Sequence, residues 1–119
     1  MENKTKVHMD QLLSPAGHPV TVLRFEGDIA SASRDTVLGV YKRLPTESSK
    51  LILLDFSKVG YINSSGITLV IQLLMEAYQS ARKIYAFGLS PHFIKVFRVA
   101  GITKYAGLFQ NEADALTAL

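Results

Sequence analysis

The most constraining feature of the chain is a short run of aliphatic residues, 51–54, in which apolar side chains do not alternate with polar ones. Such a run is typical of a strand that is covered on both faces in a parallel sheet. Residues 84–87 form a second run of this kind, and between the two runs apolar residues recur at helical spacing from Ile67 to Ala81. Because parallel strands need a crossover connection, this alternation predicts an α/β fold.

The residues before the first run predict a hairpin and a helix. Residues 6–13 and 20–27 have strand character, and the short link between them is rich in turn formers, which favours an antiparallel hairpin. A helix is expected next. Either Ser31 or Ser33 is placed to cap it, and Pro45 is placed to end it.

The C-terminal third predicts two more helices and an edge strand. Ser90 precedes a proline, a combination that is typical of a helix start, and Gly101 suits the left-handed end of that helix. Residues 105–109 are expected to form an edge strand, and Asn111 can cap a last helix that ends near Leu119.

These elements fit one compact unit. A domain commonly has roughly 100–200 residues, so we expect a single domain over residues 1–119. The predicted architecture is a mixed four- to five-stranded sheet with an N-terminal antiparallel hairpin and helices mainly on one face. Residues 51–54 should lie near the centre of the sheet.

Composition argues against several classes of protein. The chain has no cysteine and only three scattered histidines, so neither thiol chemistry nor a metal site is predicted. Its net charge of +3 comes without a cationic run, so direct nucleic-acid binding is unsupported. The longest nearly apolar stretch, 67–75, is far shorter than the roughly 20 residues of a membrane span, and the N-terminus does not resemble a secretory signal. We therefore expect a cytoplasmic protein without membrane insertion.

After the strand at 51–54 the sequence predicts a turn that includes Lys58. The most informative segment follows it: Asn63-Ser64-Ser65-Gly66, a small polar cluster that opens the second predicted helix. Capping alone can explain it, since a small polar side chain there accepts backbone N–H bonds worth about 1 kcal/mol. A functional explanation uses the same physics. Phosphate on a serine at a helix N-terminus meets free N–H donors and the positive end of the helix dipole, which makes such a serine a credible reversible switch.

Catalytic explanations fit this segment less well. It is not a Gly-x-Ser-x-Gly motif, and no histidine is placed obviously to complement a serine nucleophile. Gly60 and Gly66 do not form a phosphate-binding loop, because no lysine follows Gly66 and the intervening Tyr61 and Ile62 look like core side chains. No enzymatic activity and no cofactor are predicted.

At this point the whole pattern resembles the STAS-domain family, and within it the bacterial anti-sigma-factor antagonists. The segments that carry the resemblance are Phe25-Glu26-Gly27-Asp28-Ile29, Leu54-Asp55-Phe56, Asn63-Ser64-Ser65-Gly66, Phe87-Gly88-Leu89-Ser90-Pro91, Val99-Ala100-Gly101-Ile102 and Glu112-Ala113-Asp114-Ala115-Leu116. They follow the family's order and spacing over most of the chain.

The resemblance implies a partner-switching protein. In that family an anti-sigma factor with serine-kinase activity phosphorylates the first serine of the motif, which weakens their complex, and a metal-dependent serine phosphatase restores binding. By position this serine is Ser64, and its motif neighbours are Asn63, Ser65 and Gly66. Where the family usually has an aspartate, this chain has Asn63, and where a second acid is expected it has Ala30.

Two matters stay open from the sequence. Asp28, Lys58, Leu69 and Leu73 are candidate partner contacts, but the simpler explanations are solvation for Lys58 and coverage by a neighbouring helix for the two leucines. The alternative function is that of a constitutive sensor, a scaffold or a subunit of a lipid-transport complex, without serine switching.

Overall fold

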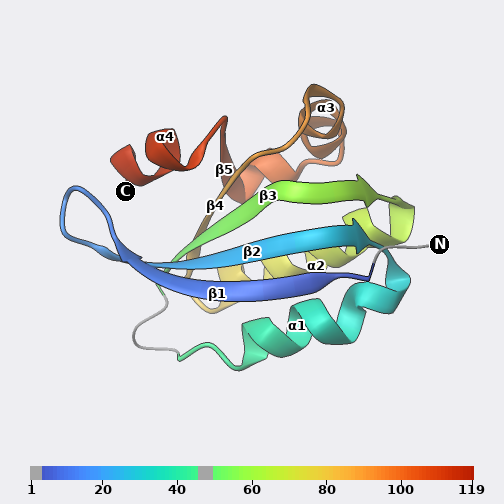
Figure 1. Cartoon of the computed structure of the whole chain (residues 1–119), viewed down its shortest axis with the longest axis horizontal. Helices are drawn as coiled ribbons and strands as arrows, with labels where there is room; N and C mark the ends of the chain where they lie inside the picture. The colour runs from blue at the N-terminus through green and yellow to red at the C-terminus, as the bar shows by residue number, and fades with distance from the viewer. Residues whose placement is uncertain (1–3, 46–49) are drawn as a thin grey trace.

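A computed structural model describes residues 4–45 and 50–119. Within these residues, five strands form one mixed sheet in the order β1-β2-β3-β4-β5 (Figure 1). The strands are β1 (Lys6–Leu13), β2 (Pro19–Ile29), β3 (Leu51–Ile62), β4 (Lys83–Phe87) and β5 (Ala106–Phe109). β1 and β2 pair in an antiparallel hairpin, and the other neighbours are parallel. The predicted mixed sheet is confirmed, with residues 51–54 in its central strand.

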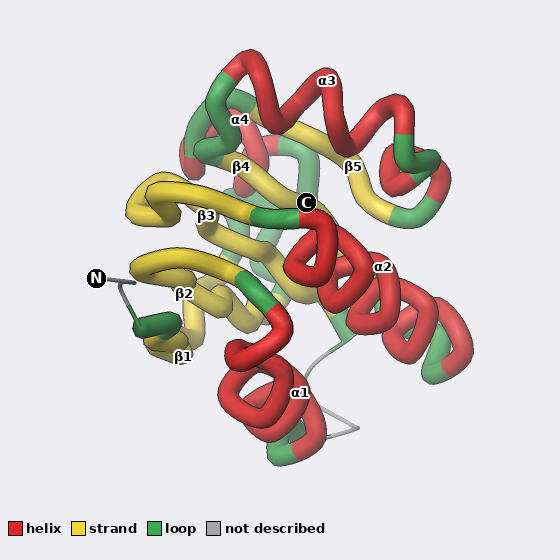
Figure 2. The backbone as a smooth tube through the Cα atoms, turned by 90° about the vertical axis from the view of Figure 1, so that its right-hand side faces the viewer, coloured by secondary structure: helices red, strands yellow, loops and turns green. Residues whose placement is uncertain are grey.

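The helices cover the two faces of the sheet unequally (Figure 2). They are α1 (Arg34–Lys42), α2 (Ser64–Gln79), α3 (Pro91–Val99) and α4 (Glu112–Thr117), with short 3-10 turns at η1 (Ser31–Ser33) and η2 (Ile102–Lys104). The larger core joins residues of α1, α2 and α3 to the inner positions of the strands, such as Leu54 and Phe56. α4 packs on the opposite face, where Ala115 meets Val22 and Leu53 in a smaller core. The expectation of helices mainly on one face is confirmed. Among the described residues, no helix is both long and apolar enough to cross a membrane.

β3 is longer than its sequence suggests. The sequence predicts a strand over 51–54 and then a turn, whereas the strand continues to Ile62 alongside β2. Register shifts between Arg24 and Asp28 interrupt the pairing, as β-bulges do. Because bulges break regular alternation, the second half of β3 lacks the usual strand pattern, and the prediction of a turn around Lys58 is wrong.

Most of the predicted caps are confirmed. The side chains of Asn63, Ser90 and Asn111 each accept a backbone N–H of the helix they precede, and Gly101 is left-handed with a φ of 80°. Ser33 precedes α1 but makes no side-chain cap bond, and its hydroxyl accepts the N–H of Ala30 instead. The hydroxyl cap predicted for the first helix is therefore wrong.

A charged cluster fastens α4 to the sheet. Arg24 on β2 donates to Asp10 on β1 over 2.6 Å, to Asp55 on β3 over 2.9 Å and to Glu112 on α4 over 2.7 Å. These carboxylates, led by the hydrogen bond with Asp10, raise the pKa of Arg24 above its ordinary value. Asp55 is buried and also accepts the N–H of Ser57 over 2.9 Å. The cluster therefore pairs the buried carboxylate of Asp55 with the positive charge of Arg24.

Candidate functional site

The candidate site lies where β2 and β3 end and α2 begins. The N–H of Asn63 donates to the carbonyl of Ile29 over 3.2 Å, which ties the end of β3 to the end of β2. Asn63 Oδ1 then accepts the N–H of Gly66 over 2.8 Å. Ser64 is the first residue of α2, as the sequence predicts.

Gly66 holds the first turn of α2 against the sheet. A Cβ atom at this position would lie 2.1 Å from the carbonyl oxygen of Ile29 and 2.8 Å from Cγ2 of Ile62. No real Cβ tolerates such an approach to backbone, so only glycine fits without a shift. The last residue of the Ser-Ser-Gly cluster is thus explained by close packing.

The two serines at this helix start are exposed. The side-chain oxygen of Asn63 accepts the N–H of Gly66, and its backbone carbonyl accepts the N–H of Ile67. This leaves the N–H groups of Ser64 and Ser65 without a hydrogen-bond partner among the described residues. The start of α2 therefore presents two hydroxyls together with two free donors and the positive end of the helix dipole.

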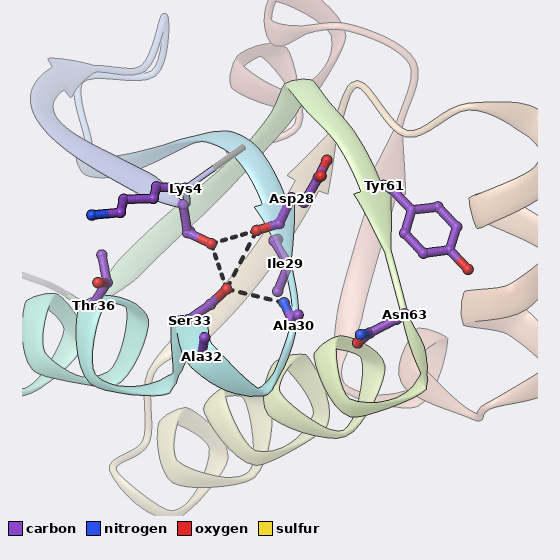
Figure 3. A pocket seen from close by; sticks show the side chains of 10 residues that line it. Lys4, Asp28, Ile29, Ala30, Ala32, Ser33, Thr36, Tyr61 and Asn63 are labelled. Atoms are coloured by element: carbon purple, nitrogen blue, oxygen red, sulfur yellow. Dashed lines mark hydrogen bonds between the residues drawn. The ribbon is translucent and has the colours of Figure 1, made fainter. Parts of the chain in front are cut away.

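Beside the helix start the surface is hollowed. The Asn63 hollow has a volume of about 470 Å³, and its walls come from the N-terminal segment, the end of β2, η1, the start of α1 and the end of β3 (Figure 3). Asp28, Tyr61 and Asn63 line it on the side of the sheet and α2, and Lys4 and Thr36 line it on the other side. Because Asn63 both lines the hollow and precedes Ser64, the hollow and the exposed serine form one continuous surface.

Hydroxyl groups brace one wall of the Asn63 hollow. The hydroxyl of Thr5 bonds to the hydroxyl of Ser33 and donates to the carbonyl of Asp28. Ser33 in turn accepts the N–H of Ala30 over 3.0 Å. The sequence analysis did not identify this role of Thr5, because its partners Asp28 and Ser33 lie 23 and 28 residues away along the chain.

Tyr61 also belongs to this surface, so its predicted core position is wrong. Its side chain is 58% exposed, and its ring lies 6.2 Å from that of Phe93 on α3. Its neighbour Ile62 is buried. Alternation along a strand would have placed Tyr61 on the side opposite Ile62, but the unexpected length of β3 concealed this signal.

The two charged candidates for partner contact occupy different places. Asp28 lines the Asn63 hollow. Lys58 is exposed on β3, and its Nζ lies 3.7 Å from Oε1 of Glu26 on β2, beside a neighbouring hollow. A hydrogen bond from His8, and to a smaller extent the charge of Lys58, hold the pKa of Glu26 below its ordinary value. Asp28 is thus next to the helix start, whereas Lys58 belongs to a charged strand surface.

The structure contradicts the suggestion that Leu69 and Leu73 contact a partner. Their exposed fractions are 4% and 1%, and both belong to the larger core. Part of α1 lies against α2, so the flank of α2 that a helical wheel leaves open is covered. This packing is decided by the tertiary arrangement and cannot be read from the period of one helix.

The histidines form no recognisable catalytic or metal site. His8 bonds to Glu26, His18 bonds to the carbonyl of Leu119, and His92 packs on the ring of Phe93. Within residues 4–45 and 50–119, no group of three or more histidine, aspartate or glutamate side chains is placed to hold a metal ion. No hydrogen bond joins a histidine ring to a serine hydroxyl in the same residues.

The chain matches one family model and is similar in structure to several solved proteins. The family model of the STAS domain matches residues 14–115. An anti-sigma factor antagonist from Mycobacterium paratuberculosis is similar in structure, with a TM-score of 0.78 and 16% identity over 97% of this chain and 93% of that one. The Bacillus cell fate determinant SpoIIAA in its phosphorylated form gives a TM-score of 0.68 and 18% identity over 94% and 97% of the two chains.

An anion transporter also contains a similar unit. The murine anion transporter Slc26a9 gives a TM-score of 0.71 and 12% identity, covering 96% of this chain but 22% of the transporter. None of the curated protein sequences compared with the chain matches it. At these identities the similarity to solved structures establishes a common fold.

Proposed function

Because the chain belongs to the STAS domain family, we propose that it is a partner-switching regulator controlled by phosphorylation of Ser64. Unmodified, it binds an anti-sigma factor that is also a serine kinase. Phosphorylation by that kinase weakens the complex, and a metal-dependent serine phosphatase restores it. The protein acts in the cytoplasm as a non-enzymatic binding domain, residues 1–119, and needs no cofactor, nucleic acid or membrane insertion.

The observation that supports the proposal most directly is the position of Ser64. The residue is exposed at the start of α2, where two backbone N–H groups are free, and it directly follows a residue that lines the Asn63 hollow. A kinase can reach a hydroxyl in this position without unfolding the helix. Phosphate attached there gains N–H donors and a favourable helix dipole, so the fold tolerates the modification.

The modification changes the surface strongly. Phosphate adds roughly two negative charges and three acceptor oxygens at pH 7. Asp28 already places a carboxylate on the adjoining hollow, so a partner that complements the unmodified surface meets both added charge and added bulk after phosphorylation. A loss of ~1.4 kcal/mol reduces affinity about tenfold, which is sufficient to exchange partners.

Asn63 is the departure from the family motif that matters most for this proposal. Its amide oxygen caps α2 as an aspartate would, so the helix start is preserved without the usual negative charge beside Ser64. A kinase that recognises this motif therefore meets a less acidic site. Asn63→Asp tests whether that charge tunes recognition by the kinase.

The proposal is tested by combining modification and binding. The purified protein is incubated with ATP and a candidate anti-sigma factor kinase from the same organism, the modified residue is located by mass spectrometry, and affinity is measured by calorimetry. We expect phosphate on Ser64 and at least about tenfold weaker binding. Ser64→Ala should bind normally and resist switching. Ser65→Ala is the matched control, because Ser65 is also exposed on the same turn, and it should still switch.

Two results would reject Ser64 as the switch. One is modification confined to another residue, and the other is equal partner affinity of the modified and unmodified forms. Either result would leave the assignment to the STAS family intact.

A constitutive sensor, scaffold or transport subunit remains the second candidate. The observation that favours it is the similarity to a unit within the anion transporter Slc26a9, which occupies 22% of that chain. This function requires a stable partner and no serine modification. A complex that persists unchanged in the presence of kinase and ATP would support it over partner switching.

A further inference from the structure

A second surface lies at the opposite end of α2 from Ser64. The helix has 16 residues, so its two ends are about 24 Å apart. A groove of about 260 Å³ runs between the C-terminal end of α2, the start of β4 and the segment that leads from η2 into β5. We call it the Tyr78 groove. The residues used below are Tyr78, Arg82, Lys83, Lys104 and Tyr105, all of which line it.

The Tyr78 groove is basic. Arg82, Lys83 and Lys104 line it, and none of its described lining residues is acidic. Lys83 and Lys104 are exposed, and they come from β4 and η2, which are distant in sequence. The hollow beside Glu26 offers a contrast, because its lysines face that glutamate. The positive charge of the Tyr78 groove is therefore not balanced within its own walls.

Arg82 is held in place by residues that do not line the groove. Its guanidinium carbon lies 4.9 Å from the centre of the Tyr41 ring, and one of its terminal nitrogens donates to the carbonyl of Leu44 over 3.3 Å. Arg82 consequently contributes a fixed positive charge, whereas the exposed lysines can adjust to a ligand.

Two exposed tyrosines give the groove an apolar wall. Tyr78 is 67% exposed and Tyr105 is 38% exposed, and their ring centres lie 5.6 Å apart in an edge-to-face arrangement. The sequence predicts Tyr78 on the buried stripe of α2, but the helix ends at Gln79 and the ring lies outside the core. Exposed aromatic rings beside unbalanced cations are typical of binding surfaces.

We propose that the Tyr78 groove binds an extended acidic segment of a protein partner. Carboxylates of the segment pair with Lys83 and Lys104, and an apolar side chain between those carboxylates lies on Tyr78 and Tyr105. Charge complementarity with the exposed Lys83 and Lys104 favours an acidic segment. Nucleic acid is disfavoured because the two rings pack edge to face on each other, which leaves less open ring surface for bases. The ~24 Å separation lets this segment bind together with a partner at Ser64.

Fluorescence anisotropy tests the proposal on the full unmodified chain. The probe is a labelled short peptide of alternating aspartate and glutamate with one central leucine, and its control replaces every acid with the matching amide. We expect saturable binding of the acidic peptide only. The double variant Lys83→Gln and Lys104→Gln should weaken binding about tenfold, because two charge contacts with the peptide are lost.

A matched double variant separates the groove from net charge. Lys6→Gln with Lys58→Gln removes the same charge from the hollow beside Glu26 and should change the affinity less than about twofold. Tyr78→Ser should weaken binding by several fold, because the apolar contact is lost. Since Tyr78 is mostly exposed, this variant should keep the fold, which circular dichroism checks.

Several outcomes would overturn the proposal. If the two double variants weaken peptide binding equally, the peptide is attracted by net charge alone. If Tyr78→Ser binds the peptide as tightly as the unchanged protein, the groove is not the binding site. Absence of peptide binding, combined with lysine-dependent binding of phosphatidylserine vesicles or of single-stranded DNA, would assign the surface to a membrane or to nucleic acid instead. None of these measurements depends on Ser64, so they leave the proposed switch unaffected.

Discussion

Replacing Gly66 with alanine should destabilise the protein, although alanine is the better helix former. The added Cβ would lie 2.1 Å from the carbonyl oxygen of Ile29 and 2.8 Å from the carbonyl carbon. Both atoms belong to the backbone of β2, whose end is also hydrogen-bonded to Asn63. The clash cannot be relieved by rotating a side chain, so either α2 or the end of β2 must move.

The size of the effect follows from two opposing contributions. Overpacking costs typically 1–3 kcal/mol, and a rigid backbone neighbour places Gly66→Ala near the upper end, at about 3 kcal/mol. Alanine recovers about 0.5–1 kcal/mol in a helix. The net loss in the free energy of unfolding is therefore about 2 kcal/mol, or a fall in Tm of roughly 6–10 °C for a domain of this size.

Gly39→Ala is the matched control. Gly39 lies within α1, and its added Cβ would meet only a terminal nitrogen of Arg43 at 3.5 Å, an ordinary contact. The helix contribution then acts alone, so this variant should gain about 0.5–1 kcal/mol. Urea and thermal denaturation followed by circular dichroism measure both variants. The reasoning fails if the two substitutions shift stability in the same direction or if Gly66→Ala leaves it unchanged.

Three further predictions concern polar contacts. Asn63→Ala should lower the free energy of unfolding by about 1 kcal/mol while Asn63→Asp should not, because only alanine removes the cap oxygen; urea denaturation compares them. His8→Ala should raise the pKa of Glu26 toward its ordinary value, as followed by NMR titration. Because the folded-state pKa of Glu26 is depressed, its contribution to stability is present above the ordinary glutamate range and is lost as pH falls through the folded pKa. Arg24→Met should cost about 1–3 kcal/mol in urea denaturation, since it leaves the buried carboxylate of Asp55 without its cation; a cost below about 0.5 kcal/mol would show that the cluster contributes little.

Local features of the sequence predicted much of the site. Asn63 caps α2, Ser64 begins it and Ser90 caps α3, because each cap depends on residues within one helical turn. The hydroxyl cap expected at Ser33 failed for the opposite reason. Its hydroxyl accepts the N–H of Ala30 and also bonds to Thr5, a residue 28 positions away that no local pattern connects to it.

The surfaces around the site required the tertiary structure. Leu69 and Leu73 lie on a part of α2 that the period of one helix leaves ambiguous, and they are buried because other elements pack over them. The Tyr78 groove likewise brings together side chains from α2, β4 and the segment after η2. Neither outcome follows from the spacing of residues within one element.

The sequence by itself determined the order of strands and helices, the parallel centre of the sheet and the polar start of α2. These properties arise from hydrophobic period and capping, which act over a few neighbouring residues. Only the tertiary structure decided how far β3 extends, which flank of α2 is buried and where Asp28 meets Asn63 around one hollow. Each of these depends on contacts between residues far apart in the chain, so their energies are fixed only when the elements pack together.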